Sequence, residues 1–138
     1  MANNITDYLE SALVKHLFRG VAYTAPASIY LALYTVTPGE TGGGTEVTGG
    51  AYARKVLTTS PTGSSSFSDP GTSNSTSNSA VQTFATATAD WGTVVAAALL
   101  DAATAGNMLW YGPLTTSRSV LSGDTFEVSA SQLSIALD

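Results

Sequence analysis

Apolar side chains recur at three- and four-residue spacing between residues 5 and 19, which places them along one side of an α-helix. The stripe comprises Ile5, Leu9, Ala12, Leu13, His16 and Leu17. Asn4 is the expected N-cap of this helix, and Gly20 is its expected end. Two interpretations are open: the stripe covers one end of a sheet, or the helix docks on a neighbouring subunit through Leu13 and Leu17.

Residues 29–36 form the strongest predicted strand, because apolar side chains occupy both of its faces. This pattern indicates a central strand, or a strand with one face in a subunit contact. Shorter strands are expected at residues 51–58, 81–86, 94–100, 108–114, 125–128 and 132–137. Strands at about ten-residue spacing with turns between them favour an antiparallel sandwich or barrel. We therefore predict a mainly β fold, a jelly-roll-like antiparallel β-sandwich with one N-terminal α-helix, formed by residues 1–138 as a single domain.

Two segments are predicted as flexible loops, residues 38–50 and 59–80. The first is rich in glycine but has no lysine and carries two glutamates, which excludes a phosphate-binding loop. The second consists mostly of serine, threonine, asparagine, glycine and proline, and Phe67 is its only large apolar residue. It is interpreted as a surface loop, a disordered segment, an arm that reaches a neighbouring subunit with Phe67 as its anchor, or a glycan-binding segment.

Charged residues make up only 11% of the 138 residues, where an ordinary soluble domain carries about a quarter. A polar but nearly uncharged surface suits a chain that packs among copies of itself or other subunits. The net charge is −5, and the five basic residues form no run, so binding to nucleic acid is not expected. The chain has no cysteine, which excludes disulfides and cysteine-based zinc sites.

Candidate chemistry is sparse. His16 is the only imidazole and lies on the apolar stripe, and the ten carboxylates are scattered, so we expect no catalytic site, no metal and no cofactor. The N-terminus is polar and acidic, unlike a signal peptide, and the longest apolar run, residues 94–100, is too short to span a membrane. The larger aromatic residues either form the core or line a glycan or protein contact: Tyr30, Tyr34, Tyr52, Trp91, Trp110 and Tyr111.

Several short motifs occur in a characteristic order along almost the whole chain. They are YTAP (23–26), IYLALY (29–34), GGAYAR (49–54), ATADWGT (87–93), GNMLWYG (106–112), LTTS (114–117) and SGDT (122–125). This series resembles the small virion proteins of tailed bacteriophages that are labelled tail-fibre-like. The chain departs from the family in its alanine-rich strand at 94–100 and its long serine-rich segment. The resemblance implies a β-rich component of the virion exterior without enzymatic activity.

Together, composition and resemblance lead to the prediction of a non-enzymatic bacteriophage structural protein on the particle exterior. The preferred interpretation is a capsid decoration or cement protein that stabilises the head. Its expected partners are its own copies, in a homo-oligomer such as a trimer, and other virion proteins such as the major capsid protein, without nucleic acid or membrane. The alternative is a tail-fibre or tail-tip module that binds a host glycan.

Overall fold

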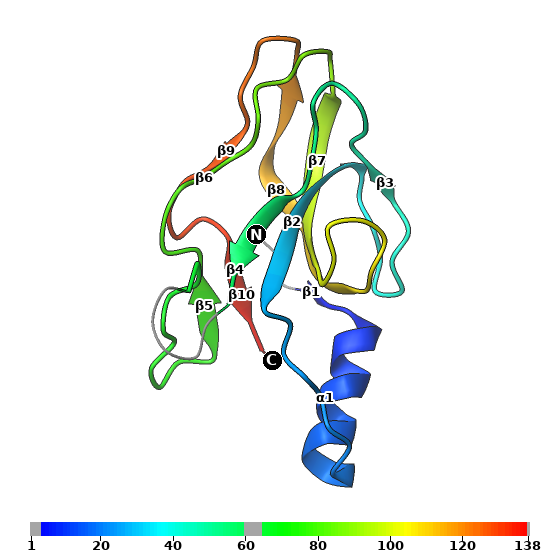
Figure 1. The fold of residues 1–138 in the computed structure, drawn as a ribbon, viewed down its shortest axis with the longest axis vertical. Helices are drawn as coiled ribbons and strands as arrows, with labels where there is room; N and C mark the ends of the chain where they lie inside the picture. The colour runs from blue at the N-terminus through cyan, green and yellow to red at the C-terminus, as the bar shows by residue number, and fades with distance from the viewer. Residues whose placement is uncertain (1–3, 60–64, 138) are drawn as a thin grey trace.

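A large antiparallel sheet forms the body of the protein, in a computed structural model that describes residues 4–59 and 65–137. Its three long strands are β2 (Ser28–Val36), β7 (Gly92–Leu100) and β8 (Met108–Val120). The strand order is β1-β8-β7-β2-β3, and β4 also pairs with β2 (Figure 1). The short members are β1 (Asn4–Ile5), β3 (Thr45–Glu46) and β4 (Lys55–Thr58).

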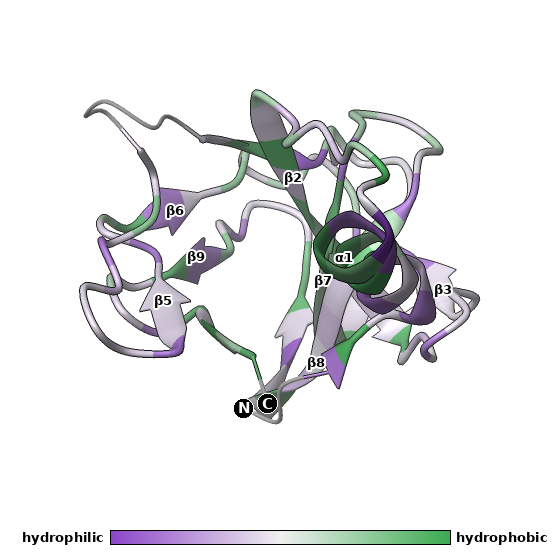
Figure 2. Cartoon of the chain, turned by 90° about the horizontal axis from the view of Figure 1, so that it is seen from below, coloured by the Kyte–Doolittle hydropathy of each residue, from purple (hydrophilic) through white to green (hydrophobic). Residues whose placement is uncertain are grey.

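Two small antiparallel ladders form a second, smaller layer. One pairs β5 (Ser75–Ser77) with β10 (Ser134–Ala136), and the other pairs β6 (Gln82–Thr83) with β9 (Glu127–Val128). Both ladders lie on the same side of the large sheet (Figure 2). The mainly β, antiparallel fold with one helix is therefore confirmed, whereas the jelly-roll connectivity stays a prediction.

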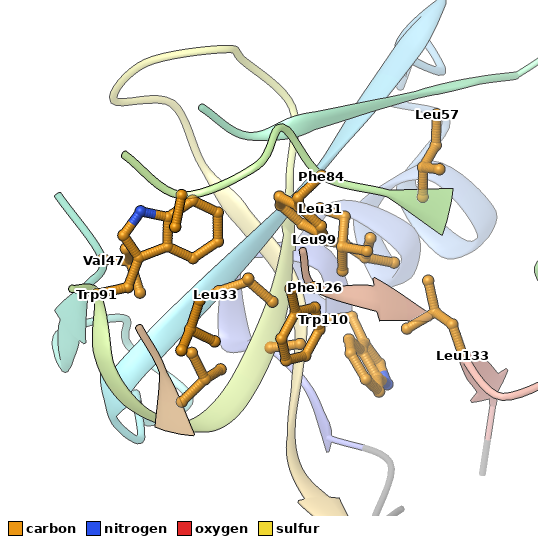
Figure 3. Close-up of a cluster of buried hydrophobic side chains, with 14 residues drawn as sticks. Leu31, Leu33, Val47, Leu57, Phe84, Trp91, Leu99, Trp110, Phe126 and Leu133 are labelled. Atoms are coloured by element: carbon orange, nitrogen blue, oxygen red, sulfur yellow. The ribbon is translucent and has the colours of Figure 1, made fainter. Parts of the chain in front are cut away.

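The main hydrophobic core lies between these two layers (Figure 3). Leu31, Leu33 and Leu99 enter it from the large sheet, and Phe126 and Leu133 enter from the opposite layer. Aromatic rings meet edge to face within it, as in the pair Phe84–Phe126, whose ring centroids are 5.8 Å apart at 86°. Such pairs add about 0.5–1.5 kcal/mol to the free energy gained by burial alone.

Strand β2 is central, as its sequence predicts. It pairs with β7 along one edge and with β3 and β4 along the other. Its second face is also buried, because Ala32 and Tyr34 belong to a smaller core cluster with Ala96, Ala98, Leu100 and Tyr111. The alanine-rich segment is likewise a buried strand, β7, so the predictions of strands at 29–36 and 94–100 are confirmed.

The helix α1 (Asp7–Arg19) begins two residues later than its apolar pattern predicts. Thr6 is the N-cap, because its Oγ1 accepts a hydrogen bond from the Leu9 backbone N–H at 3.5 Å. Asn4 and Ile5 instead pair with Tyr111 and Trp110 as β1. The predicted N-cap at Asn4 and the helix range 5–19 are therefore wrong, whereas the end at Gly20 is confirmed by its left-handed conformation.

Residues 65–80 of the serine-rich segment, where a flexible loop is predicted, are folded onto the body and include the short strand β5. The backbone of this segment makes hydrogen bonds from Ser66 N to Thr58 O at 2.8 Å and from Ser68 N to Ser77 O at 2.7 Å. Strand β5 pairs with β10, and Asn78 is fully buried. The remaining residues of this predicted loop, 60–64, lie outside the described residues. The other predicted loop, 38–50, contains β3 and a bridge between Gly39 and Gly42.

Candidate subunit-contact site

The helix α1 projects from one end of the body, and none of its side chains is fully buried (Figure 1). Leu17 is 70% exposed and Phe18 is 80% exposed, and Val14 and Val21 are also exposed. A helix that packs on its own domain turns an apolar stripe toward the core and covers it. The base of α1 does cover part of the body, since Leu9, Ala12 and Leu13 are half-buried, whereas the apolar side chains at its free end remain open to a partner.

The structure separates the three residues that sequence analysis named as subunit contacts. Leu17 lies exposed on the last turns of α1, and Leu13 is half-buried one turn nearer the body. Phe67 packs against the main core, so it does not lie beside the two leucines. Its role as an anchor for another subunit stays a prediction. Sequence analysis missed Val14 and Phe18, although both directly follow members of the apolar stripe.

A groove lies at the base of α1, where the helix joins the body. It is lined by Asn4, Ile5, Glu10, Leu13, Val14, Glu40, Ala136 and Leu137, and its volume is about 420 Å³. The backbone holds the base of the helix there through hydrogen bonds from Asp7 N to Glu40 O at 3.2 Å and from Thr6 N to Leu109 O at 3.1 Å. The groove thus combines apolar side chains from both chain ends with two carboxylates.

The two ends of α1 carry opposite charge. Asp7 and Glu10 lie in the first turn, and His16 and Arg19 lie in the last turn. These placements complement the helix dipole, whose N-terminus is positive. His16 is exposed, and its Nδ1 lies 3.1 Å from the Val21 carbonyl, so it has no role in a buried site. The base of the helix is therefore acidic and its free end is basic.

A second polar feature, centred on Arg54, connects three segments of the body. Its Nε and Nη2 donate hydrogen bonds to the two carboxylate oxygens of Glu46, both at 2.8 Å, and Nη1 donates to the Ala102 and Ala105 carbonyls. Tyr52 donates to Glu46 Oε1 and accepts from the Leu33 backbone N–H, each at 2.9 Å. Because all these groups bind one another, we assign the cluster a structural role.

Burial raises the pKa of the Tyr52 hydroxyl above its ordinary value. The hydrogen bond from the Leu33 N–H lowers this pKa in part, and the neighbouring Glu46 carboxylate raises it further. The folded chain therefore holds this proton to higher pH than the unfolded chain does. It follows that stability from Tyr52 is fully present below about pH 10, the ordinary pKa of tyrosine, and is lost as the pH rises above it.

We expect Tyr52→Phe to flatten this alkaline loss of stability. The variant should also be about 1 kcal/mol less stable at pH 7, because the Leu33 N–H loses its acceptor. Urea denaturation at a series of pH values between 7 and 11 measures both effects. An alkaline slope equal to that of the wild type would show that Tyr52 does not cause it.

Most of the aromatic residues considered for a glycan contact lie in the core. Trp91, Trp110, Tyr111 and Tyr34 are buried, and Trp91 Nε1 donates a hydrogen bond to the Gly50 carbonyl at 2.9 Å. Stacking on a sugar requires an exposed aromatic face, which these four side chains do not offer. Tyr30 and Tyr52 are half-buried.

Within residues 4–59 and 65–137, no group of three or more histidine, cysteine or acidic side chains is placed to hold a metal ion. No helix in the same part of the chain is long and apolar enough to cross a membrane.

Comparison with known proteins gives a family match over almost the whole chain. The model of a protein family described as "Podophage GP4 fiber I protein gp80" matches residues 4–136. No curated protein matches the chain. The match supports the resemblance to small, tail-fibre-like structural proteins of phage virions and extends from β1 to β10. The chain belongs to the family of the podophage GP4 fiber I protein gp80.

Proposed function

We propose that this protein is a non-enzymatic subunit of a fibre on the exterior of a bacteriophage particle, and that the free end of α1 joins it to a neighbouring subunit. The family description supports a fibre in preference to a capsid decoration protein. The sparse charge of the chain supports close packing among subunits, because few charges need to lose their hydration.

The exposure of Leu17 and Phe18 carries this proposal. Full burial of a leucine or phenylalanine side chain stabilises an assembly by about 1.5–3 kcal/mol, so a free helix end with both residues exposed favours association.

Gold-labelled antibody against the protein, applied to intact particles, tests this function. We expect label on fibres that extend from the particle. Label spread over the head would instead support the capsid-decoration hypothesis and overturn the fibre assignment. If purified particles lack the protein altogether, as judged by mass spectrometry, the virion function is wrong.

A further inference from the structure

We infer that two copies of this chain pair antiparallel through α1, each inserting its helix tip into the groove at the base of the other copy's helix. The tip is defined as residues 15–21, and the base groove is the cavity described above, lined by Asn4, Ile5, Glu10, Leu13, Val14, Glu40, Ala136 and Leu137. The inference rests on the proposed function only in taking α1 as a subunit contact; it identifies the partner as a second copy.

The apolar parts of the tip and the groove complement each other. The tip presents Leu17, Phe18 and Val21, all at least half exposed. The base groove offers five apolar side chains, including Leu137, which is itself exposed at the end of the chain's last strand. Its volume of about 420 Å³ falls within the range of cavities that enclose small ligands, so it has room for large side chains from a partner.

The charges are complementary as well. The tip carries Lys15 and Arg19, and the sequence has no acidic residue between positions 11 and 39. The base groove carries Glu10 and Glu40, and none of its described lining residues is basic. Opposite charges therefore meet when the tip of one copy lies at the base of the other, which favours this partner over an unrelated surface.

The same charges decide the orientation of the pair. In an antiparallel pair, each acidic first turn lies beside the basic last turn of the partner, and the two helix dipoles oppose each other. In a parallel pair or a parallel trimer, like charges would face one another at both ends. Antiparallel pairing is therefore the favoured arrangement.

Residue spacing makes the contact self-complementary. Val14 and Leu17 are three residues apart and lie on the same side of α1. An antiparallel partner places its Leu17 against Val14 and its Val14 against Leu17. One two-fold axis then forms both contacts at once, as in an isologous dimer, and leaves no tip or groove unoccupied.

Charge reversal on the full chain tests the pairing, with molar mass measured by light scattering after size exclusion. We expect the wild type to be a dimer. The dissociation constant of the dimer should be at least tenfold higher in each of the double variants, Lys15→Glu/Arg19→Glu and Glu10→Lys/Glu40→Lys. An equimolar mixture of the two variants should recover a mixed dimer, because the acidic tip of one variant then meets the basic groove of the other, and the second contact keeps the wild-type charges. A monomeric wild type at about 100 µM, a trimer, or a mixture no more associated than the separate variants would overturn the inference.

Removal of apolar contacts provides a second, independent test of the pairing. Leu17→Ser/Phe18→Ser should be monomeric and should keep the circular dichroism spectrum of the wild type, since both side chains are exposed in the single chain. Its unfolding temperature should not depend on protein concentration, whereas that of a dimeric wild type should rise with concentration. Leu121→Ser is the matched control, because Leu121 is 52% exposed but lies after β8, outside the helix and the base groove. It should remain a dimer, and a dimer of the helix variant would overturn the inference. Antibody label on fibres together with a monomeric wild type would contradict the pairing and leave the proposed function intact.

Discussion

Replacement of Arg54 by alanine is expected to lower the free energy of unfolding by about 3 kcal/mol. The side chains of Arg54 and Glu46 are only 9% and 23% exposed, and they form the bidentate ion pair described above. Removing one partner from a buried ion pair typically costs about 3–5 kcal/mol, because the other charge stays buried without compensation. Water reaches part of Glu46, so we expect the lower end of that range. The Ala102 and Ala105 carbonyls lose their donor at the same time.

Chemical denaturation of Arg54→Ala, Arg54→Lys and Arg118→Ala measures this effect. Arg54→Lys should fall between the wild type and the alanine variant, because an ammonium group keeps the charge but not the planar, bidentate geometry. Arg118 is exposed on β8, so its replacement should change stability by less than about 0.5 kcal/mol. Equal stabilities of Arg54→Ala and Arg118→Ala would refute the structural role of the ion pair.

Asn78→Ala is expected to destabilise the protein by a similar amount, about 3 kcal/mol. The Asn78 side chain is fully buried and joins the serine-rich segment to the end of the chain. Its Oδ1 accepts from the Leu133 backbone N–H, and its Nδ2 donates to the Ala80 and Ser129 carbonyls, each at 2.9 Å. Alanine leaves the buried Leu133 N–H without an acceptor, and an unsatisfied buried group costs about 1–3 kcal/mol. The Ala80 and Ser129 carbonyls each lose one donor but keep the bonds from Gln82 Nε2 and from the Gln132 N–H.

Asn74→Ala is the matched control for this substitution, since it removes the same side chain four residues earlier. Asn74 is exposed, and its Nδ2 donates one hydrogen bond, to the Leu137 carbonyl at 2.7 Å. Water replaces that bond, so we expect a loss below about 1 kcal/mol. Urea denaturation of both variants gives the comparison; an Asn78 variant as stable as the Asn74 variant would mean that the buried amide does not hold the segment in place.

Local sequence patterns predict the long strands and the helix because each depends on the spacing of nearby apolar residues. The alternation around Leu31 and the apolar run at 94–100 indicate β2 and β7 directly. The start of α1 depends on a distant contact instead. Asparagine and threonine are both good N-caps, and Thr6 takes this place because Asn4 pairs with Tyr111 on β8.

The candidate site could be predicted only in part. The apolar stripe includes Leu13 and Leu17, but it does not reveal that the helix leaves the body. The base groove joins residues from both ends of the chain, such as Ile5 and Ala136, which no local motif connects. The serine-rich segment has too few apolar residues to indicate a fold, because β5 depends on pairing with β10 and on the buried amide of Asn78.

The central claim is that the end of α1 serves assembly, whereas the β body is stable without it. Incorporation of Leu17→Ser/Phe18→Ser into phage particles tests this most directly, with Leu121→Ser as the control. Both proteins are supplied from a plasmid to a phage that lacks the gene, and the protein in purified particles is quantified. We predict that the helix variant folds as the wild type does but is absent from particles, while the control is incorporated normally. Incorporation of the helix variant at the wild-type level would contradict the account.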